Sequence, residues 1–229
     1  MGERYHNLLP AFTGTSIDWN GVFGAGFANV NKRWVSVYRE VAIDELIRIA
    51  SGGLRAAPPE LLVPEIREEM ELLDRFRPSS LARLGVSRVN AIYATPTPEL
   101  SRNQQRRERI MLELKIDPAA AFVGDADFVT CLVPFMGVYR YGLERHQEVF
   151  RKYWQSVIPL KDFFKYYERL EAVEGFRWVA RMGAPRGYPR VFFIPEVLIM
   201  SPSVSTGHIR IVQHDGQMAP EEGRPSGGH

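Results

Sequence analysis

The sequence predicts an α+β domain whose core is a split, largely antiparallel β-sheet with flanking helices. Strand-like runs occur in groups along the chain instead of alternating regularly with helices. Apolar residues recur at strand period in some segments and at helical period in others. The composition is that of a globular protein, with 45% hydrophobic and 24% charged residues in a chain of 229 residues.

The chain divides into three regions by composition. Residues 1–33 combine glycines with scattered aromatic residues, which is typical of an N-terminal arm packed on a core and not of a linker. Residues 34–214 contain the periodic segments and are expected to form the folded domain. Residues 215–229 are rich in Gly, Pro, Glu and Ser, so we expect a disordered tail.

Within the domain, the predicted order is a strand, two helices, two strands, two helices and three strands. Strand-like patterns cover residues 34–41, 87–95, 110–116, 176–182, 190–200 and 208–214. Helical patterns cover residues 44–50, 60–75, 139–157 and 160–170. The first helix is expected to end at Gly52-Gly53, and residues 123–127 are interpreted as a turn.

The most apolar strand, Val191–Met200, carries one carboxylate, Glu196. A carboxylate inside an apolar strand must be paired, hydrogen-bonded or functional, because burying it alone is costly. The alternative is a solvent-facing side chain at a bulge made by Pro195. Two upstream features favour a functional residue: Tyr38-Arg39 near the end of the first strand, and Tyr93–Thr97 at the end of the second.

In the order of these features, the chain resembles the ADP-ribosyltransferase superfamily, in its Arg–Ser/Thr–Glu branch, over residues 34–212. Members of that branch carry an arginine on an early strand, a Ser-Thr-Ser-like turn on a middle strand and a catalytic glutamate on a late strand. The matching positions here are Arg39, Thr95-Pro96-Thr97 and Glu196. The resemblance implies an ADP-ribosyltransferase-like fold that uses NAD as its substrate and no metal.

The resemblance implies that Glu196 is the catalytic carboxylate. Breaking the bond between nicotinamide and ribose develops oxocarbenium-like charge on the sugar, as in glycoside cleavage. A fixed carboxylate stabilises that charge and can hold the ribose 2′-hydroxyl. Arg39 would bind phosphate oxygens or a ribose edge with its planar fork of donors. Thr95 would hydrogen-bond the ribose or orient Glu196.

Three more residues complete the expected NAD site. Tyr38 or Tyr93 would face the nicotinamide ring, and Thr97 follows Thr95 in the middle motif. Each of these residues also has a plain structural interpretation. The tyrosines can be core residues, Thr95-Pro96 can be a strand stop, and Arg39 can be a surface residue at a strand end. The functional interpretation rests on their joint occurrence with Glu196.

The acceptor of ADP-ribose is constrained by Ile194, two positions before Glu196. Family members that modify arginine carry a second acidic residue there, and an isoleucine cannot orient or deprotonate an acceptor. We therefore expect a mono-ADP-ribosyltransferase, of the bacterial toxin or effector kind, whose macromolecular acceptor is a protein or nucleic acid and not arginine. A glutamate from elsewhere, such as Glu99, is the alternative supplier of that carboxylate.

Two other functions use the same residues. An NAD glycohydrolase would take water as the acceptor, and a non-catalytic member of the fold would bind a nucleotide or a protein. Metal and thiol chemistry are not favoured, because the five histidines show no metal-binding spacing. The single cysteine, Cys131, lies in an apolar run and is interpreted as a buried, inert thiol.

The formal charge of +2 is too small to indicate binding to nucleic acid or to an anionic membrane by itself. The sequence has no apolar stretch of transmembrane length and no N-terminal signal-peptide pattern. We therefore expect a protein without a membrane partner, either cytoplasmic or exported as an effector by a route that leaves no such signal.

Overall fold

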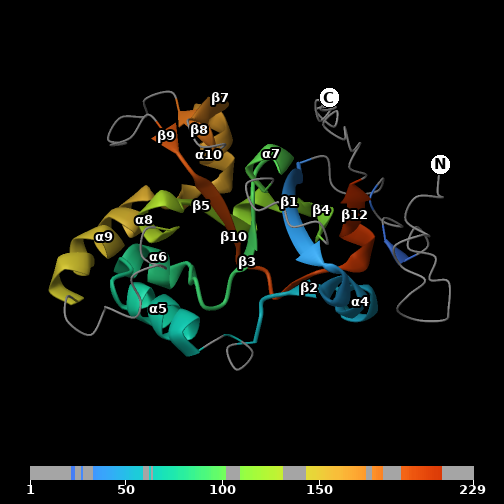
Figure 1. The fold of residues 1–229 in the computed structure, drawn as a ribbon, viewed down its shortest axis with the longest axis horizontal. Coiled ribbons are helices and arrows are strands. Elements are labelled where there is room, and N and C mark those ends of the chain that lie inside the picture. The colour runs from blue at the N-terminus through green and yellow to red at the C-terminus, as the bar shows by residue number, and fades with distance from the viewer. Residues whose placement is uncertain are drawn as a thin grey trace, which may run out of the picture.

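The computed structural model describes residues 22–23, 27, 33–58, 62, 64–101, 109–130, 143–173, 177–182 and 192–212. These residues form a mixed α+β fold in which the strands of every sheet pair antiparallel (Figure 1). The strand orders are β3-β10-β5-β6 in a four-stranded sheet and β1-β4-β12 and β7-β8-β9 in two three-stranded sheets, and β11 pairs with β2. The predicted α+β class is confirmed.

The first sheet contains β1 (Val35–Ala42), β4 (Arg109–Ile116) and β12 (Ile209–Val212). β1 and β4 pair along their full length without a break in register, so side chains alternate strictly between the two faces. One face is apolar and is covered by helix α4 (Ile43–Gly52), which buries Leu46 and Ile49. The helix ends where Gly53 adopts a φ of 74°, as the glycine pair predicted.

The second sheet contains β3 (Ile92–Ala94), β10 (Pro195–Ile199), β5 (Ala121–Asp125) and β6 (Ile158–Pro159). Both faces of β10 are covered. Val197 and Ile199 belong to the main core, which is shared with the first sheet. Leu198 belongs to a second cluster beneath helices α5 (Pro64–Arg75) and α9 (Leu143–Ser156). This burial explains why β10 is the most apolar strand of the sequence.

A single backbone bridge joins the two sheets. The amide of Tyr38 donates to the carbonyl of Thr95, and the amide of Thr95 donates back to the carbonyl of Tyr38, both at 2.7 Å. β3 therefore lies between β1 and β10, and the three segments that carried the sequence argument become spatial neighbours (Figure 1).

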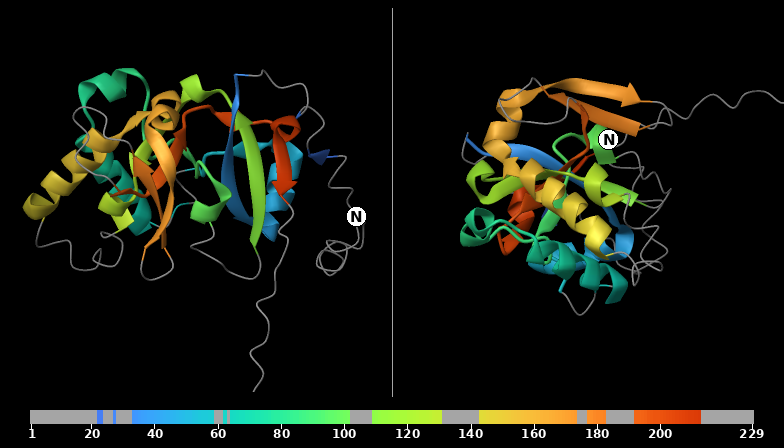
Figure 2. Two further views of the ribbon diagram at one scale, coloured as in Figure 1. Left: turned by 90° about the horizontal axis from the view of Figure 1, so that it is seen from above. Right: turned by 90° about the vertical axis from the view of Figure 1, so that its left-hand side faces the viewer.

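Shorter elements surround the two sheets. The helices are α6 (Ser79–Arg83), α7 (Pro98–Ser101), α8 (Asp127–Thr130) and α10 (Leu160–Tyr166), with 3₁₀ turns at Pro118–Ala120 and Thr206–His208. The strands are β2 (Leu54–Arg55), β7 (Tyr167–Val173), β8 (Arg177–Met182), β9 (Phe192–Phe193) and β11 (Ser203–Val204). The β7–β8 hairpin lies along one edge of the molecule (Figure 2).

Several predicted elements differ from those observed. The expected strand over residues 87–95 is limited to β3, because residues 87–91 form a loop held by helix α5. The expected helix over residues 160–170 ends at Tyr166, and the chain continues into β7. The predicted turn at residues 123–127 is wrong, since β5 continues to Asp125. The glycine and the aspartates that indicated a turn stand at the end of a buried strand.

The predicted strand over residues 190–200 is interrupted at Ile194, which separates β9 from β10. Most of the predicted N-terminal arm and all of the predicted tail lie outside the described residues. Of the arm, Phe23 is buried in the main core, and Phe27 lies 4.7 Å from the Arg210 guanidinium carbon. No helix in the described part of the chain has the length and apolar character needed to cross a bilayer.

Candidate functional site

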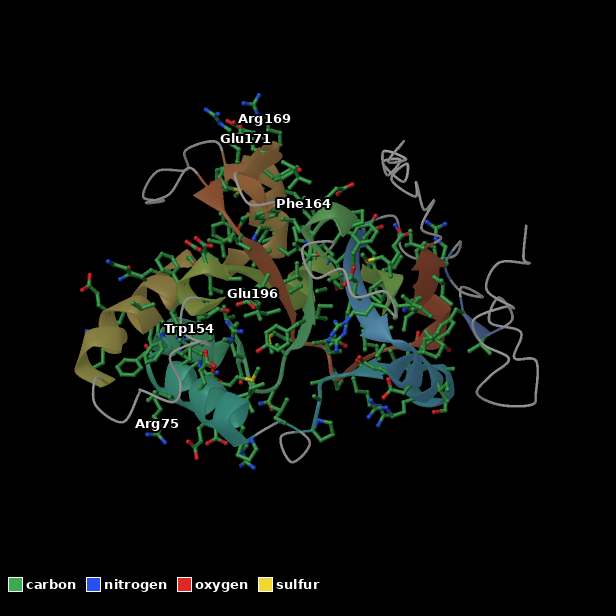
Figure 3. All side chains as sticks on the ribbon, in the orientation of Figure 1. Arg75, Trp154, Phe164, Arg169, Glu171 and Glu196 are labelled. Carbon is green, nitrogen blue, oxygen red and sulfur yellow. The ribbon has the colours of Figure 1, made fainter. Side chains whose placement is uncertain are left out.

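Glu196 lies on β10 and forms an ion pair with Arg88, whose guanidinium nitrogen is 2.6 Å from the carboxylate oxygen. The two side chains are 14% and 11% exposed, so the pair is largely withdrawn from water. The sequence predicted that this carboxylate is paired, hydrogen-bonded or functional. The ion pair with Arg88 confirms that it is paired. Figure 3 shows Glu196 at the centre of the molecule, between the strands and helix α9.

Asp125 fixes the backbone just before Glu196. Its fully buried carboxylate accepts hydrogen bonds from the amides of Ile194 and Asp127, at 3.0 and 3.2 Å. The amide of Ala126 donates to the Ile194 carbonyl at 2.7 Å. The break between β9 and β10 is thus bonded to β5 through both backbone groups of Ile194. These bonds set the direction in which β10 enters the sheet and presents Glu196.

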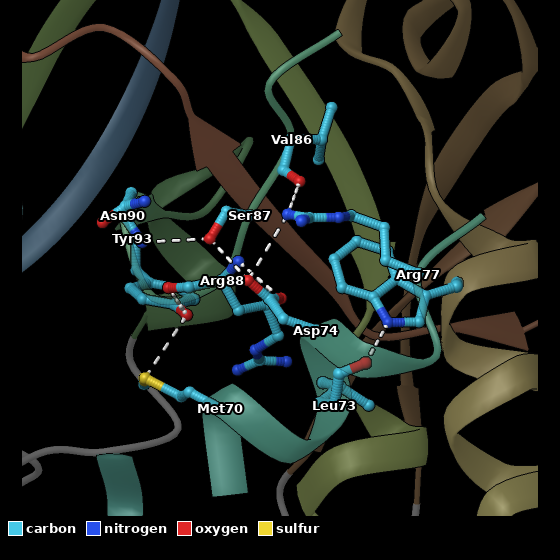
Figure 4. Close-up of polar contacts among 10 residues, drawn as sticks. Met70, Leu73, Asp74, Arg77, Val86, Ser87, Arg88, Asn90 and Tyr93 are labelled. Atoms are coloured by element: carbon cyan, nitrogen blue, oxygen red, sulfur yellow. Dashed lines mark hydrogen bonds and ion pairs between the residues drawn. The ribbon is translucent and has the colours of Figure 1, made fainter. Parts of the chain in front are cut away.

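Helix α5 fixes Arg88 through Asp74 (Figure 4). The Asp74 carboxylate accepts hydrogen bonds from the Arg88 amide at 3.1 Å and from the Ser87 hydroxyl at 2.5 Å. Arg77, two residues beyond the end of α5, donates to the Val86 carbonyl. The loop that precedes β3 is therefore anchored at successive residues, and the Arg88 side chain is held toward β10.

Two tyrosines flank the Arg88 guanidinium. Its central carbon lies 5.2 Å from the ring centre of Tyr93 and 5.0 Å from that of Tyr153, which is cation–π geometry. The Tyr93 hydroxyl donates to the Arg88 carbonyl at 2.6 Å. Burial is the largest single influence and lowers the pKa of Arg88, but the Glu196 charge and the two tyrosines together outweigh it, and the net shift is upward. The guanidinium therefore stays protonated despite its burial.

The phenols remain neutral in this cluster. Burial, against the opposing charge of Arg88, raises the pKa of Tyr93 to about 12. Burial also raises the pKa of Tyr153, and the Glu196 carboxylate adds to that shift. The Tyr153 hydroxyl is buried and has no hydrogen-bond partner among the described residues. It lies against Gly124, where an added Cβ would be 2.8 Å from the hydroxyl oxygen.

Glu69 is a second carboxylate in this neighbourhood. It lies on α5, half-buried, and burial raises its pKa. The charge of Arg88 opposes that shift, whereas the charge of Glu196 adds to it. Two carboxylates and one guanidinium therefore share this cluster, which we define as the Glu196 cluster: Glu196, Arg88, Tyr93, Tyr153 and Glu69.

Three of the predicted site residues share one face of the joined sheets with Glu196. Tyr38 bridges Thr95, Tyr93 is two residues before Thr95, and Leu198 pairs with Tyr93. Residues opposite each other in an antiparallel pair project to the same side, and so do residues two apart along a strand. By this alternation Tyr38, Thr95 and Tyr93 lie on the face of Glu196.

Arg39 lies on the opposite face of β1, with the buried residues Val37 and Val41. Its guanidinium donates to the Tyr93 carbonyl at 3.2 Å and forms an ion pair with Glu45 of α4 at 2.8 Å. The structure thus gives Arg39 and Glu196 separate partners and does not bring them together. Through these contacts Arg39 joins β1, β3 and α4. The sequence analysis expected its guanidinium to bind phosphate oxygens beside Glu196.

The middle motif binds mainly to the backbone. The Thr95 hydroxyl lies 3.3 Å from the Tyr38 carbonyl and 2.9 Å from the Thr97 carbonyl, and it donates to these acceptors. The Thr97 hydroxyl is buried without a hydrogen-bond partner among the described residues. Thr97, Tyr38 and Glu99 line a cleft next to the bridge between the sheets. The expected roles of Thr95 and Thr97 toward ribose stay predictions.

Sequence reasoning missed Arg88, Tyr153 and Glu69. Arg88 was included in a predicted strand, and its position beside Glu196 follows from the Asp74 contacts with the loop. Tyr153 was interpreted as core packing on a helix, which is correct for the ring and omits its contact with Arg88. One feature of the sequence could have indicated this position. Arg88 is a cation beside an apolar strand, and it has no acidic neighbour along the chain.

No protein-family model, curated protein or solved structure matches this chain. Within the described ranges, no three His, Cys, Asp or Glu side chains are grouped so that they could hold a metal ion. The groups available for chemistry at this site are those of the Glu196 cluster. It offers a fixed carboxylate, a fork of guanidinium donors and aromatic faces in a largely water-excluded position.

Proposed function

We propose that the protein is an NAD-dependent mono-ADP-ribosyltransferase in which Glu196 is the catalytic carboxylate. The observation that carries the proposal is the adjacency of β1, β3 and β10, which brings Tyr38 and Thr95 to the face of Glu196, whereas Arg39, the arginine of the resemblance, lies on the opposite face. An ADP-ribosyltransferase-like split sheet is consistent with this strand order.

The Glu196 cluster suits stabilisation of a sugar cation. An oxocarbenium-like ribose develops positive charge as nicotinamide leaves, and a carboxylate in a poorly hydrated site stabilises that charge more than it would in water. Asp125 fixes the backbone at Ile194 and thereby limits how far Glu196 can move during the reaction. A carboxylate held in place loses little energy to reorganisation as the charge develops.

Arg88 takes the phosphate-binding role that the sequence analysis gave to Arg39. Its planar fork can hold two oxygens of a pyrophosphate, and the rings of Tyr93 and Tyr153 lie at cation–π distance from it. In the protein without substrate, the same guanidinium neutralises Glu196. Substrate binding would exchange one of the carboxylate contacts of Arg88 for a phosphate contact and free a Glu196 oxygen for the ribose.

The acceptor is proposed to be a group other than arginine on a protein or nucleic acid. Ile194 supplies no acid beside Glu196, and its backbone is bonded to β5. Glu69, the nearest second carboxylate, has a raised pKa because it is buried, which makes it less available to hold a cation in its charged form.

Release of nicotinamide from NAD tests the catalytic assignment. Wild-type protein should bind NAD and release nicotinamide, whereas Glu196→Gln should lose most of the turnover, because the amide conserves shape and removes the charge. The variant should also be less stable, because Arg88 loses its carboxylate partner, so turnover is compared at a temperature where circular dichroism shows it folded. Glu68→Gln is the matched control, since Glu68 is exposed on α5. Nicotinamide release by Glu196→Gln at the wild-type rate would reject the proposal.

Labelled NAD with a cell lysate distinguishes the alternatives. Label that becomes attached to protein or nucleic acid identifies a transferase. Nicotinamide release without attachment identifies an NAD glycohydrolase that uses water as its acceptor. NAD binding without release identifies a non-catalytic member of the fold. Absence of NAD binding rejects both enzymes and leaves a non-catalytic member that binds another nucleotide or a protein.

A further inference from the structure

A second site lies beside the bridge between the sheets, outside the Glu196 cluster. It is a cleft of about 440 Å³, here called the α7 cleft, whose lining includes Ser36, Tyr38, Thr97, Glu99 and Phe164. These residues come from β1, the end of the β3 segment, α7 and α10. The volume is in the range of pockets that hold a small molecule or one large side chain. Figure 3 shows Phe164 next to α7.

Glu99 gives the α7 cleft a negative charge. It has no ion-pair partner within the part of the chain that the structure describes, unlike the neighbouring Glu113, which is paired with Arg210 and Lys115. The influence of Glu99 extends to two phenols. Burial raises the pKa of Tyr38 and of Tyr167, and the Glu99 carboxylate adds to both shifts. Glu99 is therefore an anion whose charge is not cancelled by the described residues around it.

Aromatic rings stand next to this carboxylate. Tyr38 and Phe164 both line the cleft, and Phe164 leaves 38% of its surface exposed, which is unusual for a phenylalanine beside a core. The faces of aromatic rings attract cations, and a nearby carboxylate adds direct charge attraction. The same arrangement repels phosphate and carboxylate ligands.

The polar groups of the cleft select among cations. Thr97 and Tyr38 carry hydroxyls and Glu99 carries an acceptor carboxylate, whereas the Ser36 hydroxyl already donates to Glu113 and accepts from Lys115. A guanidinium or amidinium presents several N–H donors in one plane and stacks on aromatic faces, whereas a quaternary ammonium presents no N–H donor. A compact ammonium is more strongly hydrated and loses more on entering an aromatic cleft.

We propose that the α7 cleft binds a flat, N–H-bearing cation, a guanidinium or amidinium, between Phe164 and the Glu99 carboxylate. The source is either a free guanidino compound or an arginine side chain on a protein partner, and both present the same group. The proposal concerns binding only, so it stands whether or not the protein acts on NAD.

Benzamidine is the probe, and neutral benzamide of nearly the same shape is its matched control. Both are titrated with excess nicotinamide present, because benzamide resembles nicotinamide and would otherwise enter the proposed NAD site. Ligand-observed NMR or calorimetry on the full chain should show binding of benzamidine and at least about tenfold weaker binding of benzamide, since a charge-assisted contact is lost. Glu99→Gln should lower benzamidine affinity to the level of benzamide. Phe164→Leu should weaken it while keeping the fold. Glu68→Gln, on exposed α5, should leave it unchanged.

Agmatine and a short arginine-containing peptide distinguish the two sources, because a site for protein arginine should prefer the peptide. Benzamidine binding that is equal to benzamide binding, or that is unchanged in folded Glu99→Gln, would overturn the proposal. Loss of benzamidine binding in Glu196→Gln would also overturn it, because the cation would then occupy the Glu196 cluster. Nicotinamide release does not enter these outcomes, so failure here is distinct from failure of the proposed enzyme activity.

Discussion

Replacing Arg88 by methionine tests whether the Glu196 pair is a buried one. The substitution removes the guanidinium and keeps an unbranched, apolar side chain of similar length between Tyr93 and Tyr153. It leaves the Glu196 carboxylate, 14% exposed, without its cation. Breaking a buried pair on one side costs roughly 3–5 kcal/mol, because an uncompensated charge stays inside the protein. Since both groups retain slight exposure, we expect about 3 kcal/mol.

Arg67→Met is the matched control. Arg67 and Glu71 on α5 form an ion pair with an N–O distance of 2.7 Å, nearly that of Arg88 and Glu196, but their side chains are 47% and 40% exposed. An exposed pair of this kind contributes about 0.3–0.5 kcal/mol. The two substitutions remove the same chemical group at nearly the same ion-pair distance, so the expected difference between them reflects burial together with the two tyrosine contacts of Arg88.

Urea unfolding followed by tryptophan fluorescence measures both losses. Trp154 is buried in the cluster beneath α5 and donates to the Leu73 carbonyl, so its emission reports on this region. In a chain of this size, 3 kcal/mol corresponds to a fall of roughly 6–12 °C in melting temperature. The loss should shrink in the double variant with Glu196→Gln, which removes the orphaned charge. A loss below about 1 kcal/mol at neutral pH would refute the buried-pair reasoning.

Three further outcomes follow from the same contacts. The pKa of Tyr93 is raised to about 12, so the unfolded chain ionises first, and the free energy of unfolding should fall by roughly 2.7 kcal/mol as the pH rises from about 10 to about 12. Tyr93→Phe should remove that part of the fall, and an unchanged pH profile would contradict it. Gly124→Ala should cost about 1–3 kcal/mol, because its Cβ would meet Tyr153, and Tyr153→Phe should recover part of this in the same background. Agmatine should bind the α7 cleft without accepting ADP-ribose, and transfer to agmatine that persists in Glu99→Ala would show that the interpretation of Ile194 is wrong.

The sequence was informative where periodicity is long and unbroken. β1 and β4 pair over eight residues with strict alternation, and both were predicted from that alternation. The Gly52-Gly53 pair correctly predicted the end of α4. Adjacency of the β1, β3 and β10 segments was expected only through the resemblance, because strand order depends on contacts between residues far apart in the chain.

The positions of the two arginines were not predictable from sequence patterns. A strand pattern assigned residues 87–95 to one element, but Asp74 holds the backbone of Arg88 and the hydroxyl of Ser87 in a loop. That long-range contact turns the Arg88 side chain toward Glu196. The Arg39 side chain was expected close to Glu196, because Arg39 matches the arginine of the ADP-ribosyltransferase motif. Strict alternation along β1 instead assigns it to the core-facing side, where Glu45 of α4 neutralises it.

The two carboxylates that the sequence analysis considered together belong to different charge environments. Glu196 acts on Arg88, Tyr93 and Tyr153, whereas Glu99 acts on Tyr38 and Tyr167. The lining of the α7 cleft includes no residue of the Glu196 cluster. A guanidinium held by Glu99 would therefore be bound away from the carboxylate that stabilises the sugar cation, and attack on that cation requires the nucleophile within about 3–3.5 Å. Recognition of a guanidinium and its modification are separable in this arrangement, so the α7 cleft is better suited to hold a partner than to present the acceptor.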